Sequence, residues 1–178
     1  MTLAFLFVII FVKFHDTGRN MKVCFIGHRT IQKNEELVSL LKETIIGLIN
    51  RGADTFLFGS MSEFDDLSWE VVTALKGKYP FIKRVYVRSA YPYIDERYEK
   101  YLLESYEETY FPPKLEKAGK YSYVERNYEM IDSSTYCVFY YNESYEPKVN
   151  EKPKKKSGTK IAYNYAIKKN KKIINLYK

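Results

Sequence analysis

The sequence predicts an α/β protein, a three-layer sandwich with a mainly parallel sheet of about five strands. Short apolar runs alternate along the chain with longer stretches whose apolar residues recur at helical spacing. The run 23–26 has no polar alternation, which is typical of a parallel strand that is covered on both faces. Two such runs, 23–26 and 55–58, end directly at a glycine, Gly27 and Gly59. Strands that alternate with helices in this way form parallel sheets with helices on both faces.

The expected elements follow one another in a regular order. The first helix is expected over 35–50, where Asn34 can cap its start and Gly52 lies just past its end. The other helices are expected over 65–76, 123–132 and 158–170, and the strands over 23–26, 55–58, 83–88, 136–141 and 172–177. Helices therefore connect most successive strands, as a parallel sheet requires.

Two segments interrupt this order. The segment 91–118 is rich in tyrosine, keeps a helical interval from Tyr98 to Tyr106, and contains Pro112–Pro113, which stops a helix. We expect this segment only to cover one face of the sheet, with a lid over the ligand crevice as the alternative. The segment 143–156 is charged and contains prolines, which favours a mobile loop.

Length and composition favour one domain without a disulfide or a zinc framework. A chain of 178 residues with 46% hydrophobic residues can bury a single core. The two cysteines, Cys24 and Cys137, lie inside apolar runs, where they act as small hydrophobic residues and fit a cytoplasmic protein. Two histidines and two cysteines, all widely spaced, provide no zinc-binding pattern, so we expect neither a metal nor a cofactor.

The first 20 residues lie outside the alternating pattern. Their apolar run, 3–12, is about half as long as a membrane span, and it lacks the preceding positive charge and the cleavage site of a signal peptide. Met21 stands directly before the first strand. We therefore hypothesise that 1–20 is an N-terminal apolar extension outside the native fold, that 21–178 is the domain, and that no membrane is a partner.

Charge and tyrosine are unevenly distributed. Eleven lysines and one acid stand between Lys148 and Lys178, a net charge of +10, whereas the rest of the chain carries −3 of the total of +7. Such a segment can attract a polyanion, although lysines also keep a surface loop and a final helix in solution. Fourteen of the eighteen tyrosines lie between Tyr86 and Tyr145. Their rings can stack on bases, and they can equally fill half-buried positions.

Polar motifs follow the expected strands, or begin the expected helices, at four places. In open α/β sheets, ligands bind in the crevice outside the carboxyl ends of the strands. The motifs expected to line that crevice are Gly27–His28–Arg29, Gly59–Ser60 with Asp65 and Glu70, Glu125–Arg126–Asn127, and Ser157–Gly158–Thr159. Each motif is short, so the prediction depends on their convergence at one rim of the sheet.

Together these motifs resemble the SLOG superfamily and, within it, the YpsA-like branch of bacterial proteins. That branch has Gly-His-Arg after its first strand, a glycine-rich turn followed by Asp and then Glu after its second, a Glu-Arg-Asn helix start with a later Met and Asp, and a late Gly-Gly-Thr. The matching residues here, in the same order, are Gly27–His28–Arg29, Gly59, Asp65, Glu70, Glu125–Arg126–Asn127, Met130, Asp132, Gly158 and Thr159. The resemblance implies a Rossmann-like fold with a pocket for a nucleotide or a nucleotide-derived ligand.

The chemistry of these residues agrees with such a ligand. Gly158 and Thr159 at a helix start offer backbone N–H groups and a hydroxyl to phosphate or ribose. Arg29 and Arg126 can make forked contacts to phosphate, and the acids can accept from ribose hydroxyls. The alternatives are structural: the glutamates can pair with these arginines to hold the loops, and His28 can bond a neighbouring backbone carbonyl.

The resemblance does not extend to the catalytic glutamate of a related branch. The phosphoribohydrolases of the related Lonely Guy branch carry Pro-Gly-Gly-x-Gly-Thr-x-x-Glu, whose glutamate helps to cleave a nucleotide N-glycosidic bond. Here Ala162 stands in the place of that glutamate and cannot act as an acid or a base. Ser60 also replaces a usual glycine. The candidates that remain for catalysis are Glu70, Glu125 and Asp132.

Three functions follow from these observations. The main prediction is a module that binds a nucleotide-like small molecule, for sensing or sequestering, without turnover. One alternative is a hydrolase or ribosyl transferase that acts on the N-glycosidic bond of nucleotides. The other is weak binding of single-stranded nucleic acid through the C-terminal lysines. The tyrosine-rich faces also offer a surface for a homo-oligomer.

Overall fold

A six-stranded, all-parallel sheet forms the centre of the molecule in the computed structural model, which describes residues 21–145, 148–149, 152–153 and 157–178. The expected extension 1–20 and the lysines 154–156 lie outside the described residues. In spatial order the strands are β4 (Glu108–Tyr110), β3 (Lys83–Val87), β2 (Ala53–Phe58), β1 (Met21–Gly27), β5 (Tyr136–Tyr140) and β8 (Lys172–Asn175).

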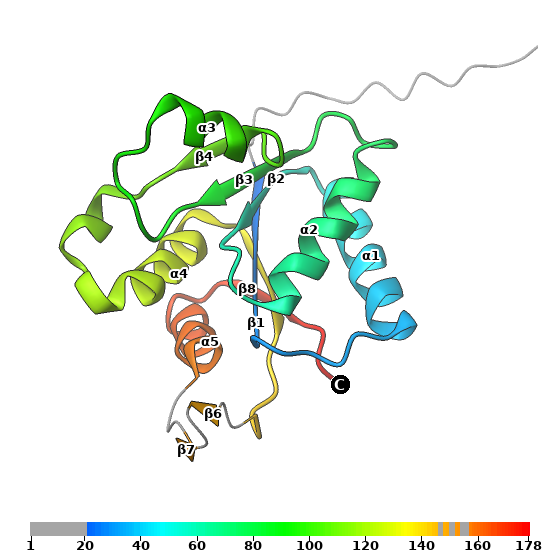
Figure 1. Ribbon diagram of the computed structural model, residues 1–178. Coiled ribbons are helices and arrows are strands. Elements are labelled where there is room, and N and C mark those ends of the chain that lie inside the picture. Colours follow the sequence, from blue (N-terminus) through cyan, green and yellow to red (C-terminus); the bar gives the residue numbers. More distant parts are fainter. Residues whose placement is uncertain (1–20, 146–147, 150–151, 154–156) are drawn as a thin grey trace, which may run out of the picture.

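Helices cover both faces of this sheet, so the predicted α/β sandwich of Rossmann type is confirmed (Figure 1). The helices α1 and α2 lie on one face, and α4 and α5 lie on the other. The bounds are α1 (Glu35–Asn50), α2 (Glu63–Leu75), α3 (Glu96–Leu103), η1 (Pro113–Lys117), η2 (Gly119–Tyr121), α4 (Ser122–Ser133) and α5 (Gly158–Lys168). A short antiparallel hairpin of β6 (Lys148–Val149) and β7 (Lys152–Pro153) precedes α5.

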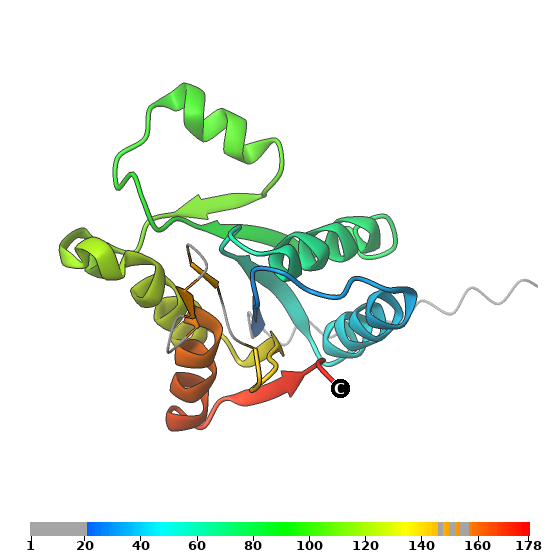
Figure 2. The same ribbon diagram turned by 60° about the horizontal axis from the view of Figure 1, so that its bottom comes forward.

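The order of the strands reverses beside β1. From β1 the chain moves outward through β2 and β3 to β4, and then returns to β5 on the other side of β1 (Figure 2). Cys24 of β1 consequently pairs with Leu57 of β2 and with Cys137 of β5. A reversal of this kind is where open α/β sheets form their ligand crevice, at the carboxyl ends of the strands.

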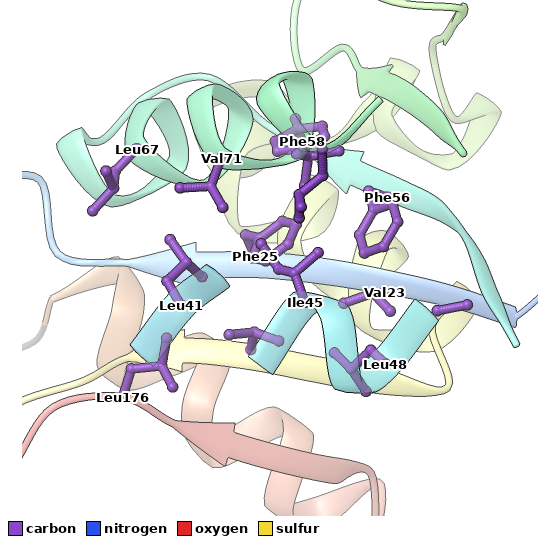
Figure 3. Close-up of a cluster of buried hydrophobic side chains, with 14 of the residues drawn as sticks. Val23, Phe25, Leu41, Ile45, Leu48, Phe56, Phe58, Leu67, Val71 and Leu176 are labelled. Atoms are coloured by element: carbon purple, nitrogen blue, oxygen red, sulfur yellow. The ribbon is translucent and has the colours of Figure 1, made fainter. Parts of the chain in front are cut away.

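Alternate residues of the strands contribute side chains to two separate hydrophobic cores, one on each face of the sheet. Toward α1 and α2, Phe25 stacks on Phe56 and Phe58 with ring centroids 6.0 and 5.3 Å apart, and Ile45 and Leu48 of α1 pack onto them (Figure 3). Toward α4 and α5, the buried side chains are smaller, and they include both cysteines, which are free thiols. Burial of both faces explains why these strands read as continuous apolar runs.

The sheet has one more strand than the sequence indicates. We expected 91–118 only to cover a sheet face, but this segment supplies α3 and the edge strand β4, which pairs with β3. Three residues, Glu108 to Tyr110, form β4, and they show no apolar run. The strand is attached through Glu107 instead, whose carboxylate accepts from the Arg84 backbone N–H and guanidinium at 2.6 and 2.8 Å.

The N-terminus of α2 begins two residues earlier than the sequence indicates, because Ser62 caps it. The Ser62 hydroxyl accepts from the Asp65 N–H at 3.1 Å. None of the helices in the described part of the chain has the length and apolar character that a membrane crossing requires. Within the same residues, no cluster of histidine, cysteine and carboxylate side chains is placed to hold a metal ion.

Candidate functional site

The turn from β2 to α2 is held by a buried carboxylate. Asp65 accepts from the backbone N–H groups of Gly59 and Ser60 at 3.2 and 2.5 Å. Ser60 has a φ of +51°, in the left-handed region that favours glycine. Burial raises the pKa of Asp65 to about 6, although the two N–H groups and the nearby Arg126 act in the opposite direction.

Arg126 is buried behind this turn and bound to the backbone. Its guanidinium donates to the carbonyl of Gly59 at 2.5 Å and to that of Val87 at 3.5 Å, and its Nε donates to Asn127 Oδ1 at 3.1 Å. A Cβ atom at Gly59 would lie 2.4 Å from the guanidinium carbon. Arg126 therefore joins α4 to the ends of β2 and β3, and its side chain is engaged with protein groups.

The end of β1 is joined to α5. The Thr159 hydroxyl donates to the carbonyl of Gly27 at 2.8 Å, and Ser157 caps α5 by accepting from the Lys160 N–H at 3.0 Å. A Cβ atom at Gly27 would lie 2.5 Å from Phe64, so α2 packs directly against this glycine. A Cβ atom at Gly158 would meet no atom of the described residues within 4 Å. The Thr159 hydroxyl, which we predicted to bind phosphate or ribose, thus donates to a backbone carbonyl of the protein.

His28 is buried beneath the turn that follows β5. The Asn142 N–H donates to its Nε2 at 2.9 Å, and its ring stacks on Tyr145 with centroids 3.9 Å apart. Burial lowers the pKa of His28, which favours the neutral ring, and its Nδ1 has no hydrogen-bond partner among the described residues. His28 Nε2 also lies 3.2 Å from the carbonyl oxygen of Asn142, so the histidine contacts a neighbouring backbone carbonyl, as its structural alternative proposes.

The candidate acids do not converge. Glu70 is exposed and pairs with Lys33 at 2.8 Å rather than with an arginine. Glu125 is half-buried, and its side chain forms no hydrogen bond or ion pair with another described residue. Asp132 lies near the C-terminal end of α4, beside the start of β8, where it pairs with Lys169 at 3.4 Å. The structure thus places Asp132 at the opposite end of the sheet from Gly27 and Gly59.

A cavity of about 550 Å³ lies between α2 and the segment around α3. We call it the aromatic cavity, and its lining residues are Ser60, Asp66, Trp69, Glu70, Tyr86, Tyr101, Leu102, Ser105 and Tyr106. A second hollow of about 280 Å³ shares Ser60 and Asp66 with it. We call this one the arginine hollow, and it is lined by Arg29, Thr30, Ser60, Met61, Ser62, Glu63 and Asp66.

Hydrogen bonds and ring contacts fix the walls of the aromatic cavity. The Tyr106 hydroxyl and Ser60 Oγ are 2.7 Å apart, and the Tyr106 and Tyr86 rings stack with centroids 5.2 Å apart. The Trp69 indole N–H donates to the Ser105 carbonyl at 3.2 Å. Burial raises the pKa of Tyr106 to about 12, so its hydroxyl stays protonated at neutral pH. The cavity is therefore preformed by contacts that hold its rings in place.

Arg29 differs from Arg126 in being exposed. Its guanidinium forms no ion pair or hydrogen bond with any residue that the structure describes, whereas its carbonyl accepts from the Glu63 N–H at 2.9 Å. The backbone is thus anchored and the charged end is available to a ligand. Arg29 and Ser60 are the predicted site residues that line the arginine hollow, and Ser60 and Glu70 are those that line the aromatic cavity.

The sequence motifs do not include the aromatic residues that line the aromatic cavity. Trp69, Tyr86, Tyr101 and Tyr106 belong to no motif and come from three separate segments. Two signals pointed toward them: the density of tyrosine after Tyr86 and the single tryptophan of the chain, which stands beside Glu70. Neither signal identifies which rings face one cavity, because that depends on how α2 and α3 lie in space.

The chain matches no protein-family model, and no curated protein matches it. Its fold is similar to that of DNA processing protein A from Streptococcus pneumoniae, with a TM-score of 0.53 and 16% identity over 86% of this chain. DNA processing protein A from Helicobacter pylori, whose structure was described for its single-stranded DNA binding mode, gives a TM-score of 0.52 and 18% identity over 88% of this chain. This chain spans 49% and 65% of the length of those two chains.

Proposed function

We propose that this chain, which shares the SLOG Rossmann-like fold of those two proteins, belongs to the YpsA-like branch and binds a nucleotide unit without turnover. The base would enter the aromatic cavity, and the phosphate would lie in the arginine hollow. The observation that carries this proposal is that the two hollows meet at Ser60 and Asp66. The aromatic rings of one hollow therefore lie beside the unpaired guanidinium of Arg29 in the other. Its reduced cysteines fit a cytoplasmic site of action.

The aromatic cavity has the size and chemistry of a base-binding pocket. Its volume of about 550 Å³ lies within the ordinary range of roughly 300–1,000 Å³ for small-molecule sites. Stacking of a base on an aromatic side chain contributes about 1–3 kcal/mol. The hydroxyls of Ser60 and Ser105 and the carboxylate of Asp66 add polar groups that can orient the ring.

The three acids that the sequence offers for catalysis do not meet at one site. Among Glu70, Glu125 and Asp132, only Glu70 lines the aromatic cavity. Asp132 is at the other end of the sheet, and Glu125 lines neither hollow. Glycoside hydrolysis ordinarily uses a pair of carboxyl groups on either side of the bond that breaks. The three candidate acids form no such pair.

Calorimetric titration with nucleoside 5′-monophosphates, and with the corresponding nucleosides, tests the proposal. Tyr101→Ala removes an exposed wall of the aromatic cavity and should weaken both ligand series about tenfold. The matched control is Tyr93→Ala, because Tyr93 is 86% exposed and Tyr101 is 64% exposed, but Tyr93 lines neither hollow. The control should bind as the unaltered protein does.

Arg29 provides the second arm of this experiment. Arg29→Gln should weaken the monophosphates about tenfold and leave the nucleosides unchanged, because only the monophosphates carry the charge that the guanidinium binds. Arg51→Gln is the control, since Arg51 is exposed and follows α1 at the amino end of β2. Absence of binding by every monophosphate, or equal affinity in Tyr101→Ala and Tyr93→Ala, would contradict the proposal.

Single-stranded DNA is the second candidate ligand, and the Helicobacter pylori structure favours it. In that case, the unit in the aromatic cavity would be one nucleotide of a strand, and the C-terminal lysines would contact further phosphates. Fluorescence anisotropy of a labelled thymidine oligonucleotide should show an affinity that falls steeply with salt. Changing Lys154, Lys155 and Lys156 together to glutamine should weaken binding and flatten the salt dependence. An affinity that changes neither with the salt concentration nor in the triple variant would contradict this candidate.

A further inference from the structure

We infer that the nucleotide for which this site is built has a positively charged ring, such as a pyridinium or an N-alkylated purine. The inference rests on the proposed function, because it places the ring in the aromatic cavity and the phosphate in the arginine hollow. It concerns selectivity between rings of similar shape and different charge. The charges and the aromatic walls of the two hollows carry the argument.

The aromatic cavity is lined by one acid that no base compensates, Asp66, and by Glu70, which pairs with Lys33 outside the lining. Its lining includes two acids, Asp66 and Glu70, and no lysine, arginine or histidine. Asp66 forms no side-chain ion pair or hydrogen bond with another described residue, and Glu63 lies close by in the arginine hollow. Burial, together with the charges of Glu70 and Glu63, raises the pKa of Asp66. This uncompensated charge favours a cationic ligand.

The aromatic walls favour the same charge. A cation over the face of a tryptophan or tyrosine ring is attracted by the π electrons, more strongly where water is excluded. Tyr86, Tyr101 and Tyr106 provide three such rings in the aromatic cavity. The guanidinium of Arg84 already lies 5.5 Å from the centroid of Trp69, but it is paired with Glu107 and lies outside the cavity lining.

The two hollows divide the charges of one ligand. Arg29, with an exposed guanidinium, lines the arginine hollow together with Glu63, whereas no base lines the aromatic cavity, and the unpaired Asp66 stands where the two hollows meet. A nucleotide with a neutral ring would use the arginine and leave the Asp66 carboxylate without a partner. A cationic ring satisfies that carboxylate while the phosphate satisfies Arg29. The site is therefore complementary to a ligand with opposite charges at its two ends.

Nicotinamide mononucleotide and its reduced form test this inference directly. The two have the same phosphate and nearly the same size, but only the oxidised ring is positively charged. Calorimetry with the full chain should show at least about tenfold tighter binding of the oxidised form. A second pair, 7-methylguanosine monophosphate and GMP, at a pH at which the methylated ring keeps its positive charge, should show the same preference with a different ring.

Substitutions of the acids show which residues cause the preference for a positively charged ring. Asp66→Asn should bring the ratio of the two affinities close to one without abolishing the binding of the reduced form. Glu43→Gln loses the same charge from an exposed position on α1, away from both hollows, and should keep the full ratio. Lys33→Gln should increase the ratio about twofold, because it releases Glu70 from its ion pair with Lys33.

The outcomes separate the inference from the proposed function. Equal affinity for the oxidised and reduced forms, or binding of AMP without binding of either cationic nucleotide, would overturn the inference and leave the proposed function intact. Failure of every monophosphate to bind would overturn both. A preference for the cationic rings that persists undiminished in Asp66→Asn and Glu70→Gln would also contradict the inference, because the charge would then be recognised elsewhere.

Discussion

The guanidinium of Arg126 leaves no room for a side chain at Gly59, the residue that follows β2. Gly59 lies against it so closely that a methyl group would reach within 2.4 Å of its central carbon. Gly59→Ala should therefore lower the free energy of unfolding by about 2 kcal/mol, because a buried, hydrogen-bonded side chain has to move. Urea denaturation followed by circular dichroism measures the change.

Gly47→Ala is the control for this substitution. Gly47 is in α1, and a methyl group there would meet nothing within 4 Å. Alanine at an unhindered position inside a helix should raise the free energy of unfolding by up to about 1 kcal/mol. A loss of stability in Gly47→Ala, or none in Gly59→Ala, would contradict the contact between Gly59 and Arg126.

Asp65 should give the molecule a distinctive pH dependence. Its pKa is about 6 in the folded state and ordinarily 3.8, so between these values the folded chain keeps a proton that the unfolded chain has lost. The free energy of unfolding contributed by Asp65 therefore falls as the pH rises from about 4 to about 6, by roughly 3 kcal/mol. Asp65→Asn should remove this slope.

The quantity to measure is the difference in unfolding free energy between the unaltered protein and Asp65→Asn across this pH range. Taking the difference cancels the titration of the other carboxylates. The two backbone N–H groups bind different oxygens of Asp65, and asparagine replaces one of these oxygens with an NH2 donor, so the variant loses one hydrogen bond at every pH. A difference that stays constant between pH 4 and pH 6 would contradict the shifted pKa.

At the scale of one element, β4 depends on Glu107. Burial tends to raise the pKa of this glutamate, but hydrogen bonds from Arg84 and Lys76 outweigh it and lower the pKa to about 2. Glu107→Gln should therefore reduce the free energy of unfolding by about 1–3 kcal/mol near neutral pH. Because the stabilisation disappears as the carboxylate is protonated, the effect should shrink as the pH falls from about 4.5 to about 2.

Glu108 is the neighbour that serves as the control for Glu107. Its ion pair with Lys83 is 2.7 Å long, but both side chains are more than half exposed. Exposed pairs of this kind contribute little, so Glu108→Gln should change the free energy of unfolding by less than about 0.5 kcal/mol. Hydrogen exchange at the amides of β4 would show whether Glu107→Gln releases that strand first. Equal effects of the two substitutions would contradict the special role of Glu107.

At the same scale, the strand β4 shows a limit of sequence-based prediction. The strands β1 and β2 are buried on both faces, so their apolar runs identify them directly. The edge strand β4 is only three residues long and is held by a salt-bridge network rather than by an apolar run. Its pairing partner β3 is 20 residues away along the chain, so no local pattern indicates the contact.

At the scale of the whole molecule, we predict that the domain folds without its first 20 residues. Among the residues that the structure describes, the sheet begins at Met21, and the buried side chains of the two cores begin at Val23 and Cys24. A chain of residues 21–178 should therefore unfold with the same urea midpoint as the full chain, to within experimental error. A large loss of stability, or an insoluble product, would contradict the domain boundary that the sequence predicts.

The rim of the sheet was predictable because its position follows from topology. Gly27, Gly59 and Thr159 come together where parallel strands end, as their places after strands or before a helix indicate. The roles of the charged residues were not predictable in this way. Arg29 and Arg126 have the same chemistry in the sequence, but one is exposed and the other is buried against carbonyl groups. Only the fold distinguishes them.

A crystal structure of the full chain with its tightest-binding nucleoside monophosphate tests the central claim most directly. The account predicts a base among Tyr86, Tyr101 and Tyr106, with the phosphate within hydrogen-bonding distance of the Arg29 guanidinium. A ligand bound at the start of α5 or elsewhere on the surface, with the aromatic cavity empty, would contradict it.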